Sequence, residues 1–290
     1  MSENLRGHFY ILIATILIAG SFKASAVLSQ NHDSIILTLF RFIFALLVLL
    51  PFVIFRLKST IKLIPYGIVV GFLYGLYFIL MFEALKYTTV LNSGSIYTLV
   101  PLMTAIFCIF ICNQKITLSL IAIYIIGIIS TLIIVFRGDL NLLMQLSLNR
   151  GDIIFFIAAL SMSLYPIAVR FLYKDGQLIP MATSTLIGGV LLMLLYLFIT
   201  QKSIDVISFS SDEAVAMSYL VVATTIFTLF LYQRGIQILG PKKVMAYIYL
   251  NPAIVAIIIY TFDGIQISFI TAIGIAISTI ATIAILNRRC

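Results

Sequence analysis

Charged side chains are scarce in this sequence. Only 10% of its 290 residues are Asp, Glu, Lys or Arg, and 62% are hydrophobic, whereas roughly a quarter of a soluble chain is charged. Because such a small number of charged residues cannot cover a surface that faces water, most side chains must face hydrocarbon or one another. The composition excludes a soluble globule and predicts an integral membrane protein.

Cysteine, histidine and tryptophan are also rare. The chain has no Trp, two His and three Cys, which are Cys108, Cys112 and Cys290. No His or carboxylate lies near the cysteine pair in sequence, so packed or lipid-facing thiols are favoured over a disulfide framework or a metal site. The sequence contains no GxxxxGK[ST] phosphate-binding motif and no cluster of acidic or His residues typical of membrane-embedded catalysis. We expect no metal, no cofactor and no enzymatic activity.

Apolar stretches follow one another along the whole chain, each close to the roughly 20 residues that a membrane-spanning helix needs. The runs are continuous, which favours helices over the alternating strands of a membrane barrel. The predicted fold class is therefore an all-α integral membrane protein with ten transmembrane helices. The predicted spans are residues 8–28, 35–55, 63–83, 90–112, 117–136, 152–172, 178–200, 214–234, 243–262 and 266–286.

Basic residues are divided unevenly between the predicted loops. With a cytoplasmic amino terminus, twelve basic residues fall in inside segments and four in outside segments. Because Lys and Arg favour the cytoplasmic side, both termini are predicted to be cytoplasmic. The net charge of +8 is thus a topology signal, and we expect no nucleic-acid partner.

The two halves of the chain carry a sparse internal repeat. Residues 84–106 align without a gap on residues 235–257, which pairs Pro101 with Pro252. Since five spans is an odd number, the second copy enters the membrane from the opposite side. This predicts an inverted repeat of the kind that supports alternating access in transporters.

Five segments of the chain, in their order along the sequence, resemble the drug/metabolite transporter superfamily of EamA type, and the resemblance covers essentially the whole chain. The segments are AGSFKASAVL, FRF at Arg41, FEALKYTTVLNSGSIYTLVPLMTAIF, NRGDIIFFIAALSMSLYPIAVR and YQRGIQILGPKKVMAYIYLNPAIVAIIIY. The resemblance implies a first EamA-type repeat of five helices in residues 1–136 and a second, inverted one in residues 151–290. An extracytoplasmic linker would occupy residues 137–150.

Lys23 and Arg41 are cations inside predicted spans. At about 1.5 Å per residue, both lie roughly 8 Å below the outer interface, where such groups must snorkel, pair or line a wet cavity. Glu83 is the nearest candidate counter-ion, although a local pair between Glu83 and Lys86 is favoured. If Lys23 and Arg41 both face a cavity, they favour an anionic or zwitterionic substrate. Snorkelling and structural pairing are the alternatives.

Hydroxyl and amide side chains recur at helical spacing. Tyr97 and Tyr247, which flank the matched prolines, are the first choices for a substrate cavity, with interfacial tyrosine belts as the alternative. With Lys23 and Arg41, the candidate substrate-binding residues are Tyr77, Tyr97, Tyr165, Tyr232, Tyr247 and Asn251.

Proline and glycine mark further positions. Pro101, Pro166 and Pro252 fall inside spans, where each removes a helix hydrogen bond and predicts a hinge or kink. Gly67, Gly71 and Gly75 form a GxxxGxxxG stripe, which predicts close packing of two helices.

These observations predict a secondary transporter that moves a small organic metabolite by alternating access, with an amino acid or another anionic or zwitterionic solute favoured. It would lie in the plasma (inner) membrane as a multi-pass monomer or homodimer, with the lipid bilayer and a small-molecule substrate as its partners. The coupling ion stays open. Export of lipophilic or cationic drugs is the alternative, and a membrane-embedded enzyme or a channel is the alternative from another class.

Overall fold

The structure is a computed structural model of the chain. It describes residues 3–30, 32–114, 116–136, 138–139, 141, 149–173, 177–203, 209–264 and 266–288. Every regular element among these residues is a helix, so the predicted all-α class is confirmed. Most of the predicted linker 137–150 lies outside the described residues.

The helices follow the predicted apolar stretches closely. Seven helical runs are long and apolar enough to cross a membrane, and one of them is the 51-residue run Ser34–Ala84, which contains two successive helices. In chain order the elements are α1 (Glu3–Ala19), α2 (Ser21–Ser29), α3 (Ser34–Val53), η1 (Ile54–Arg56), α4 (Leu57–Ala84), α5 (Val90–Tyr97), α6 (Val100–Cys112), α7 (Leu118–Val135), α9 (Arg150–Leu172), α10 (Leu178–Thr200), α11 (Ser211–Val221), η2 (Val222–Phe227), α12 (Thr228–Leu239), α13 (Pro241–Ala246), η3 (Tyr247–Leu250), α14 (Asn251–Asp263) and α15 (Phe269–Leu286).

Polar caps at the loops define where several helices begin. Asp33 accepts hydrogen bonds from the backbone N–H groups of Ile35 and Ile36 at the start of α3. Asn149 with Asp152 forms a capping box at α9, and Ser210 with Glu213 forms another at α11. These side chains satisfy N–H groups that have no partner inside the helix.

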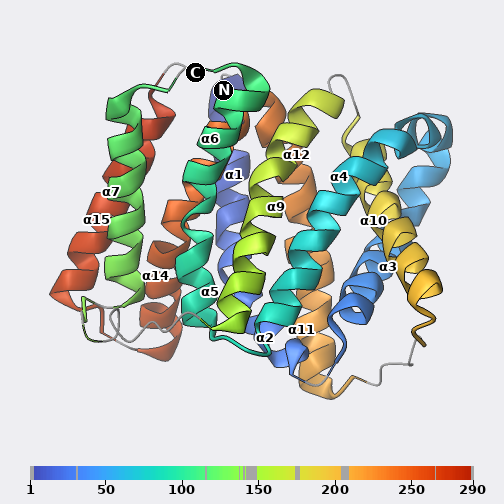
Figure 1. Cartoon of the computed structure of the whole chain (residues 1–290), viewed down its shortest axis with the longest axis horizontal. Helices are drawn as coiled ribbons and strands as arrows, with labels where there is room; N and C mark the ends of the chain where they lie inside the picture. The colour runs from blue at the N-terminus through green and yellow to red at the C-terminus, as the bar shows by residue number, and fades with distance from the viewer. Residues whose placement is uncertain are drawn as a thin grey trace.

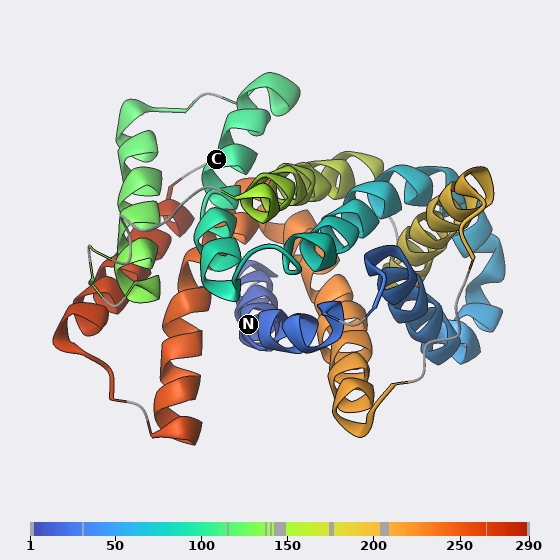
Figure 2. The same ribbon diagram turned by 60° about the horizontal axis from the view of Figure 1, so that its bottom comes forward.

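The helices stand side by side, and those of the two halves interleave (Figures 1 and 2). The second-half helix α10 packs on α4, α4 packs also on α9, α12 packs on α1, and α15 packs on α7. Helix α1 begins and α15 ends at the same end of the bundle (Figure 1). The chain thus buries each half against the other.

Several passes through the bundle are interrupted rather than straight. The matched prolines lie in equivalent places, because Pro101 is the second residue of α6 and follows a break at Thr98 and Leu99, and Pro252 is the second residue of α14 and follows the 3-10 segment η3. Helix α9 instead continues through Pro166. Near this proline, the carbonyl of Ser163 accepts the hydroxyl of Thr104 at 3.1 Å, so a neighbouring helix uses a carbonyl of this region.

The glycine stripe of α4 lies at the crossing with α10. A Cβ atom on Gly67 or Gly71 would collide with the backbone of Ser184 or Thr185, whereas one on Gly75 would meet its nearest atom, in Phe42, at 3.6 Å. The close approach is shared, because Gly188 of α10 lies against the backbone of Gly67. Two glycine surfaces thus bring the two backbones together.

Candidate functional site

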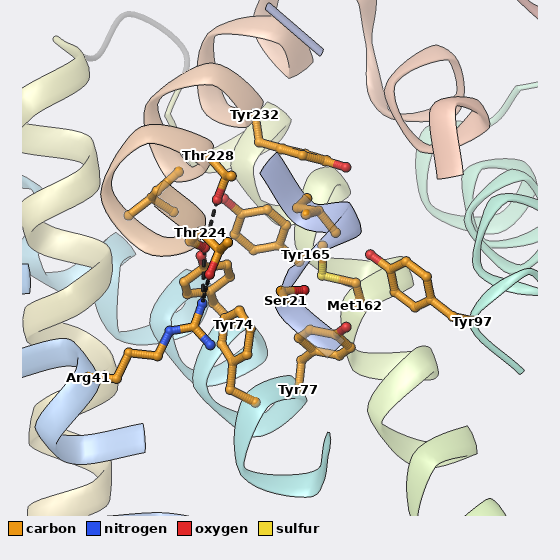
Figure 3. A pocket seen from close by; sticks show the side chains of 13 residues that line it. Ser21, Arg41, Tyr74, Tyr77, Tyr97, Met162, Tyr165, Thr224, Thr228 and Tyr232 are labelled. Atoms are coloured by element: carbon orange, nitrogen blue, oxygen red, sulfur yellow. Dashed lines mark hydrogen bonds between the residues drawn. The ribbon is translucent and has the colours of Figure 1, made fainter. Parts of the chain in front are cut away.

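A small cavity lies where helices of the two halves meet (Figure 3). Its volume is about 30 Å³, which is room for about one or two water molecules. The cavity is lined by Ile18, Ser21, Arg41, Tyr74, Tyr77, Phe78, Tyr97, Met162, Tyr165, Thr224, Thr228, Leu229 and Tyr232.

Arg41 of α3 is the only charged side chain among the residues that line this cavity. It is fully buried, and its Nε donates to the Thr225 hydroxyl at 2.6 Å. Its Nη2 donates to the carbonyl and the hydroxyl of Thr224, at 3.0 and 2.9 Å. The guanidinium carbon also lies 3.9 Å from the centre of the Phe78 ring. Residues of η2, which directly precedes α12, therefore bind one edge of the guanidinium, and the Phe78 ring contacts one of its faces.

A π-helical turn supplies the Thr residues that hold Arg41. In η2, the Thr225 hydroxyl donates to the carbonyl of Leu220, five residues earlier, at 2.8 Å. The Thr224 carbonyl accepts two side chains, those of Arg41 and Thr228. Single π turns inside α-helices are frequent at functional sites, and here the turn presents consecutive threonines to one cation.

The charge of Arg41 has no acidic partner among the described residues. Each of its hydrogen-bond acceptors is neutral, and none of the ion pairs found in the described part of the chain includes it. Its third nitrogen, Nη1, is buried without a hydrogen-bond partner. A buried charge is costly unless it is paired. The site is therefore complementary to a negatively charged group that can reach Nη1.

Tyrosines form most of the remaining polar wall, and five of them surround the cavity (Figure 3). The rings of Tyr74 and Tyr165 lie 5.1 Å apart, and those of Tyr77 and Tyr97 lie 5.9 Å apart with their hydroxyls interacting. These rings come from α4, α5, α9 and α12. They can contact an organic molecule through flat apolar faces and hydroxyl groups at once.

The structure brings together five of the eight candidate substrate-binding residues. Arg41, Tyr77, Tyr97, Tyr165 and Tyr232 all line the cavity. They lie on five different helices, namely α3, α4, α5, α9 and α12. The spacing pattern therefore identified side chains that converge although they are far apart in sequence.

The other three candidates lie elsewhere or outside the description. Tyr247 is turned toward α1, where its hydroxyl lies 2.8 Å from Nδ1 of His8, because it opens the 3-10 segment η3. Asn251 is buried at the start of α14, away from the cavity lining, and its amide has no hydrogen-bond partner among the described residues. Lys23 belongs to α2, but its side chain lies outside the described part of the structure.

Glu83 is not the counter-ion of Arg41. Its Oε2 accepts the ammonium of Lys86 at 3.0 Å and the hydroxyl of Ser34 at 2.8 Å, so the predicted local pair is present. These residues lie where α4 ends and α3 begins. The acidic residue nearest in topology is therefore used at a helix end rather than in the cavity.

Sequence reasoning missed part of the cavity wall. Ser21, Met162 and Thr224 line it but were not singled out. Thr224 and Thr225 carried the only available signal, since two adjacent polar residues in an apolar stretch must bond to something. Thr225 and Thr228 belong to the polar face expected for this helix, but a π turn cannot be recognised from residue types alone, so the sequence did not predict that both Thr224 and Thr225 contact Arg41.

Comparison with known proteins gives a consistent result. Residues 5–136 and 149–287 each match the EamA-like transporter family. The uncharacterized transporter YyaM of Bacillus subtilis (strain 168) is 28% identical over 220 residues, which cover 75% of this chain and 70% of that protein. A protein of known crystal structure superposes with a TM-score of 0.73 over 99% of this chain and 98% of the other. Their identity is 16%, so this last likeness concerns the fold.

Proposed function

Because the chain belongs to the EamA-like transporter family, and is thus a multi-pass membrane transporter, we propose that it carries a small anionic or zwitterionic organic metabolite by alternating access. The observation that carries the proposal is the buried Arg41 guanidinium, which has one nitrogen without a partner and borders a cavity between the two halves. A carboxylate or phosphate of the substrate would supply the missing negative charge. The tyrosines would contact the rest of the molecule.

We propose ten spans with both termini in the cytoplasm. Two passes fall within the run Ser34–Ala84. Two further passes are broken into shorter helices, α1 with α2 and α13 with α14. These four, with the six other long helical runs, make ten. The excess of Lys and Arg on the loops at the end where α1 starts supports the cytoplasmic assignment.

The small volume of the cavity supports alternating access as the mechanism. About 30 Å³ is too little for an amino acid, so a substrate of that size requires the halves to separate on one side. The breaks before Pro101 and Pro252 occur once in each half. In the proposed inverted repeat of residues 1–136 and 151–290, these breaks are the hinges at which the halves rearrange.

Ligand-induced thermal stabilisation of the detergent-purified protein tests the proposal. Amino acids, nucleotides, organic phosphates and lipophilic cations are screened against wild type, Arg41→Gln and the control Arg234→Gln, which changes an exposed arginine of α12. Ligand binding raises apparent stability. We expect an anionic or zwitterionic ligand to stabilise wild type and Arg234→Gln but not Arg41→Gln.

Stabilisation by lipophilic cations that is equal in wild type and Arg41→Gln would contradict this proposal. It would return Arg41 to a structural role and favour export of cationic drugs. Uptake or counterflow in proteoliposomes, with the ligand identified by the screen, then shows whether the bound compound is also carried.

A further inference from the structure

A second hollow lies at the edge of the bundle, between α3, α4 and α10. Its volume is about 540 Å³, far more than that of the cavity around Arg41. Helices α4 and α10 cross closely at Gly71 and Gly189 and diverge from this crossing toward the end of the bundle away from the start of α1 (Figure 1). The result is a groove that widens along the direction of the helices.

The sides of the groove are apolar over most of its length. Phe72, Leu76, Ile79 and Leu80 come from α4, and Leu192 and Tyr196 come from α10. Phe72 and Tyr196 are each 48% exposed, so the groove opens sideways, to the bilayer. From Gly71 to Glu83, α4 rises about 18 Å at 1.5 Å per residue, which is close to half of the roughly 30 Å hydrocarbon core. A lipid acyl chain of one leaflet matches this length.

The wide end of the groove carries balanced charges. The ammonium of Lys202 lies 2.6 Å from Oδ2 of Asp33, and that of Lys86 lies 3.0 Å from Oε2 of Glu83. An ammonium has three donors, and among the described residues each of these two lysines makes one such hydrogen bond. Two cations and two carboxylates at the rim are complementary to a headgroup that itself carries one phosphate and one amine.

We propose that this groove binds one membrane phospholipid with a zwitterionic headgroup, in the leaflet away from the start of α1. One acyl chain lies along α4 and α10, the phosphate faces Lys202 and Lys86, and the amine faces Asp33 and Glu83. An anionic phospholipid such as phosphatidylglycerol has a phosphate but no amine, so its headgroup offers no cation to the two carboxylates and it binds more weakly. This site is separate from the cavity at Arg41 and does not depend on the identity of the transported compound.

Native mass spectrometry of the full chain in detergent tests the proposal with phosphatidylethanolamine and phosphatidylglycerol. Leu192→Trp fills the groove, and Leu191→Trp is the matched control, because Leu191 is an exposed neighbour on the same helix outside the lining. We expect phosphatidylethanolamine to bind wild type at least tenfold more tightly than phosphatidylglycerol. Leu192→Trp should lose this binding at least tenfold, and Leu191→Trp should stay within twofold of wild type.

The charged rim is tested separately, so that a poorly folded tryptophan variant leaves the question decidable. Lys202→Gln combined with Lys86→Gln should weaken phosphatidylethanolamine binding about tenfold, whereas Lys58→Gln, an exposed lysine at the other end of α4, should not change it. Equal binding of the two lipids, equal loss in both tryptophan variants, or displacement of the lipid by a transported lipophilic cation would overturn the proposal.

Discussion

The cavity at Arg41 and the groove between α3, α4 and α10 differ in whether their charged side chains are paired with groups of opposite charge. The cavity is small, is lined by a single cation, and has no carboxylate among its lining residues. The groove is large, open to the side, and lined by two cations that each meet a carboxylate. In the proposals made above, the uncompensated charge attracts an anionic group of the substrate, whereas the paired charges at the rim of the groove favour one lipid headgroup over another.

The largest expected effect comes from removing the uncompensated charge. Arg41→Gln should lower the affinity for an anionic or zwitterionic substrate about 100-fold, or about 2.7 kcal/mol. It should not lower the free energy of unfolding, because the change deletes a buried charge and the Thr224 and Thr225 hydroxyls still donate to the Leu220 carbonyl. Calorimetric titration and thermal unfolding measure the two quantities. Loss of stability together with loss of affinity would make Arg41 a structural residue.

The second effect concerns the crossing that bounds the groove. Gly188→Ala places a methyl group against the Gly67 backbone, so it should destabilise the protein by about 2 kcal/mol and alter the groove without touching Arg41. Gly94→Ala is the control, because nothing lies within 4 Å of the added atom. Chemical denaturation in detergent compares the variants, and equal stability of both would show that α4 and α10 can separate at little cost.

A third effect separates two tyrosines that the sequence could not distinguish. Tyr97→Phe removes a hydroxyl that borders the cavity and should weaken substrate binding about tenfold, or about 1.4 kcal/mol. Tyr247→Phe removes a hydroxyl that contacts His8, so its substrate affinity should remain within about threefold of wild type. Titration of the same ligand against both variants checks this, and the reverse order would place the site near η3.

The smallest effect tests a compensated pair at the groove. Burial raises the pKa of Asp33, but its hydrogen bonds with Lys202 and with the Ile35 and Ile36 backbone outweigh burial and lower that pKa. Because the folded pKa is the lower one, the stabilisation is present above the unfolded pKa of about 3.9 and is lost as the pH falls through the folded value. The hydrogen bond from Lys202 to Asp33 correspondingly raises the pKa of Lys202.

Asp33→Asn keeps an oxygen for the α3 cap and removes the charge. We expect a loss of less than about 1 kcal/mol at pH 7, which shrinks as the pH falls below the unfolded pKa of about 3.9 toward the lower folded pKa of wild type. Thermal unfolding of both proteins between pH 7 and pH 3 follows this difference. A gap of the same size at pH 3 and at pH 7 would mean that hydrogen bonding, and not charge, dominates at this residue.

Much of the fold could be predicted from the sequence because it depends on local sequence patterns. Long apolar runs predicted the helices, and the positions of Pro101 and Pro252 predicted where two passes break. Helix α9 continues through Pro166, so a proline inside an apolar run did not by itself show where one helix ends and the next begins. Gly67 and Gly71 indicated a packing surface, but nothing in their spacing named Gly188 as the partner on α10.

The candidate site could be predicted only in part, because the residues that form it come from five different helices. Helical spacing selects a face but does not say which neighbour that face meets, so Tyr97 and Tyr247 looked equivalent. The short 3-10 segment η3 directs Tyr247 toward α1, and the π turn η2 directs Thr224 and Thr225 toward Arg41. Both are changes of helical pitch that depend on packing rather than on residue preference.

By itself, the sequence determined that the protein lies in a membrane, that it is helical and that a cation lies within a membrane span. These conclusions follow from the composition and from the lengths of the apolar stretches. Only the tertiary structure decided that Arg41 meets hydroxyls instead of Glu83, that five candidates share one cavity, and that a charged groove opens beside α10. Burial and pairing of a charge depend on which helices pack together, and contacts between distant segments arise only when the chain is folded.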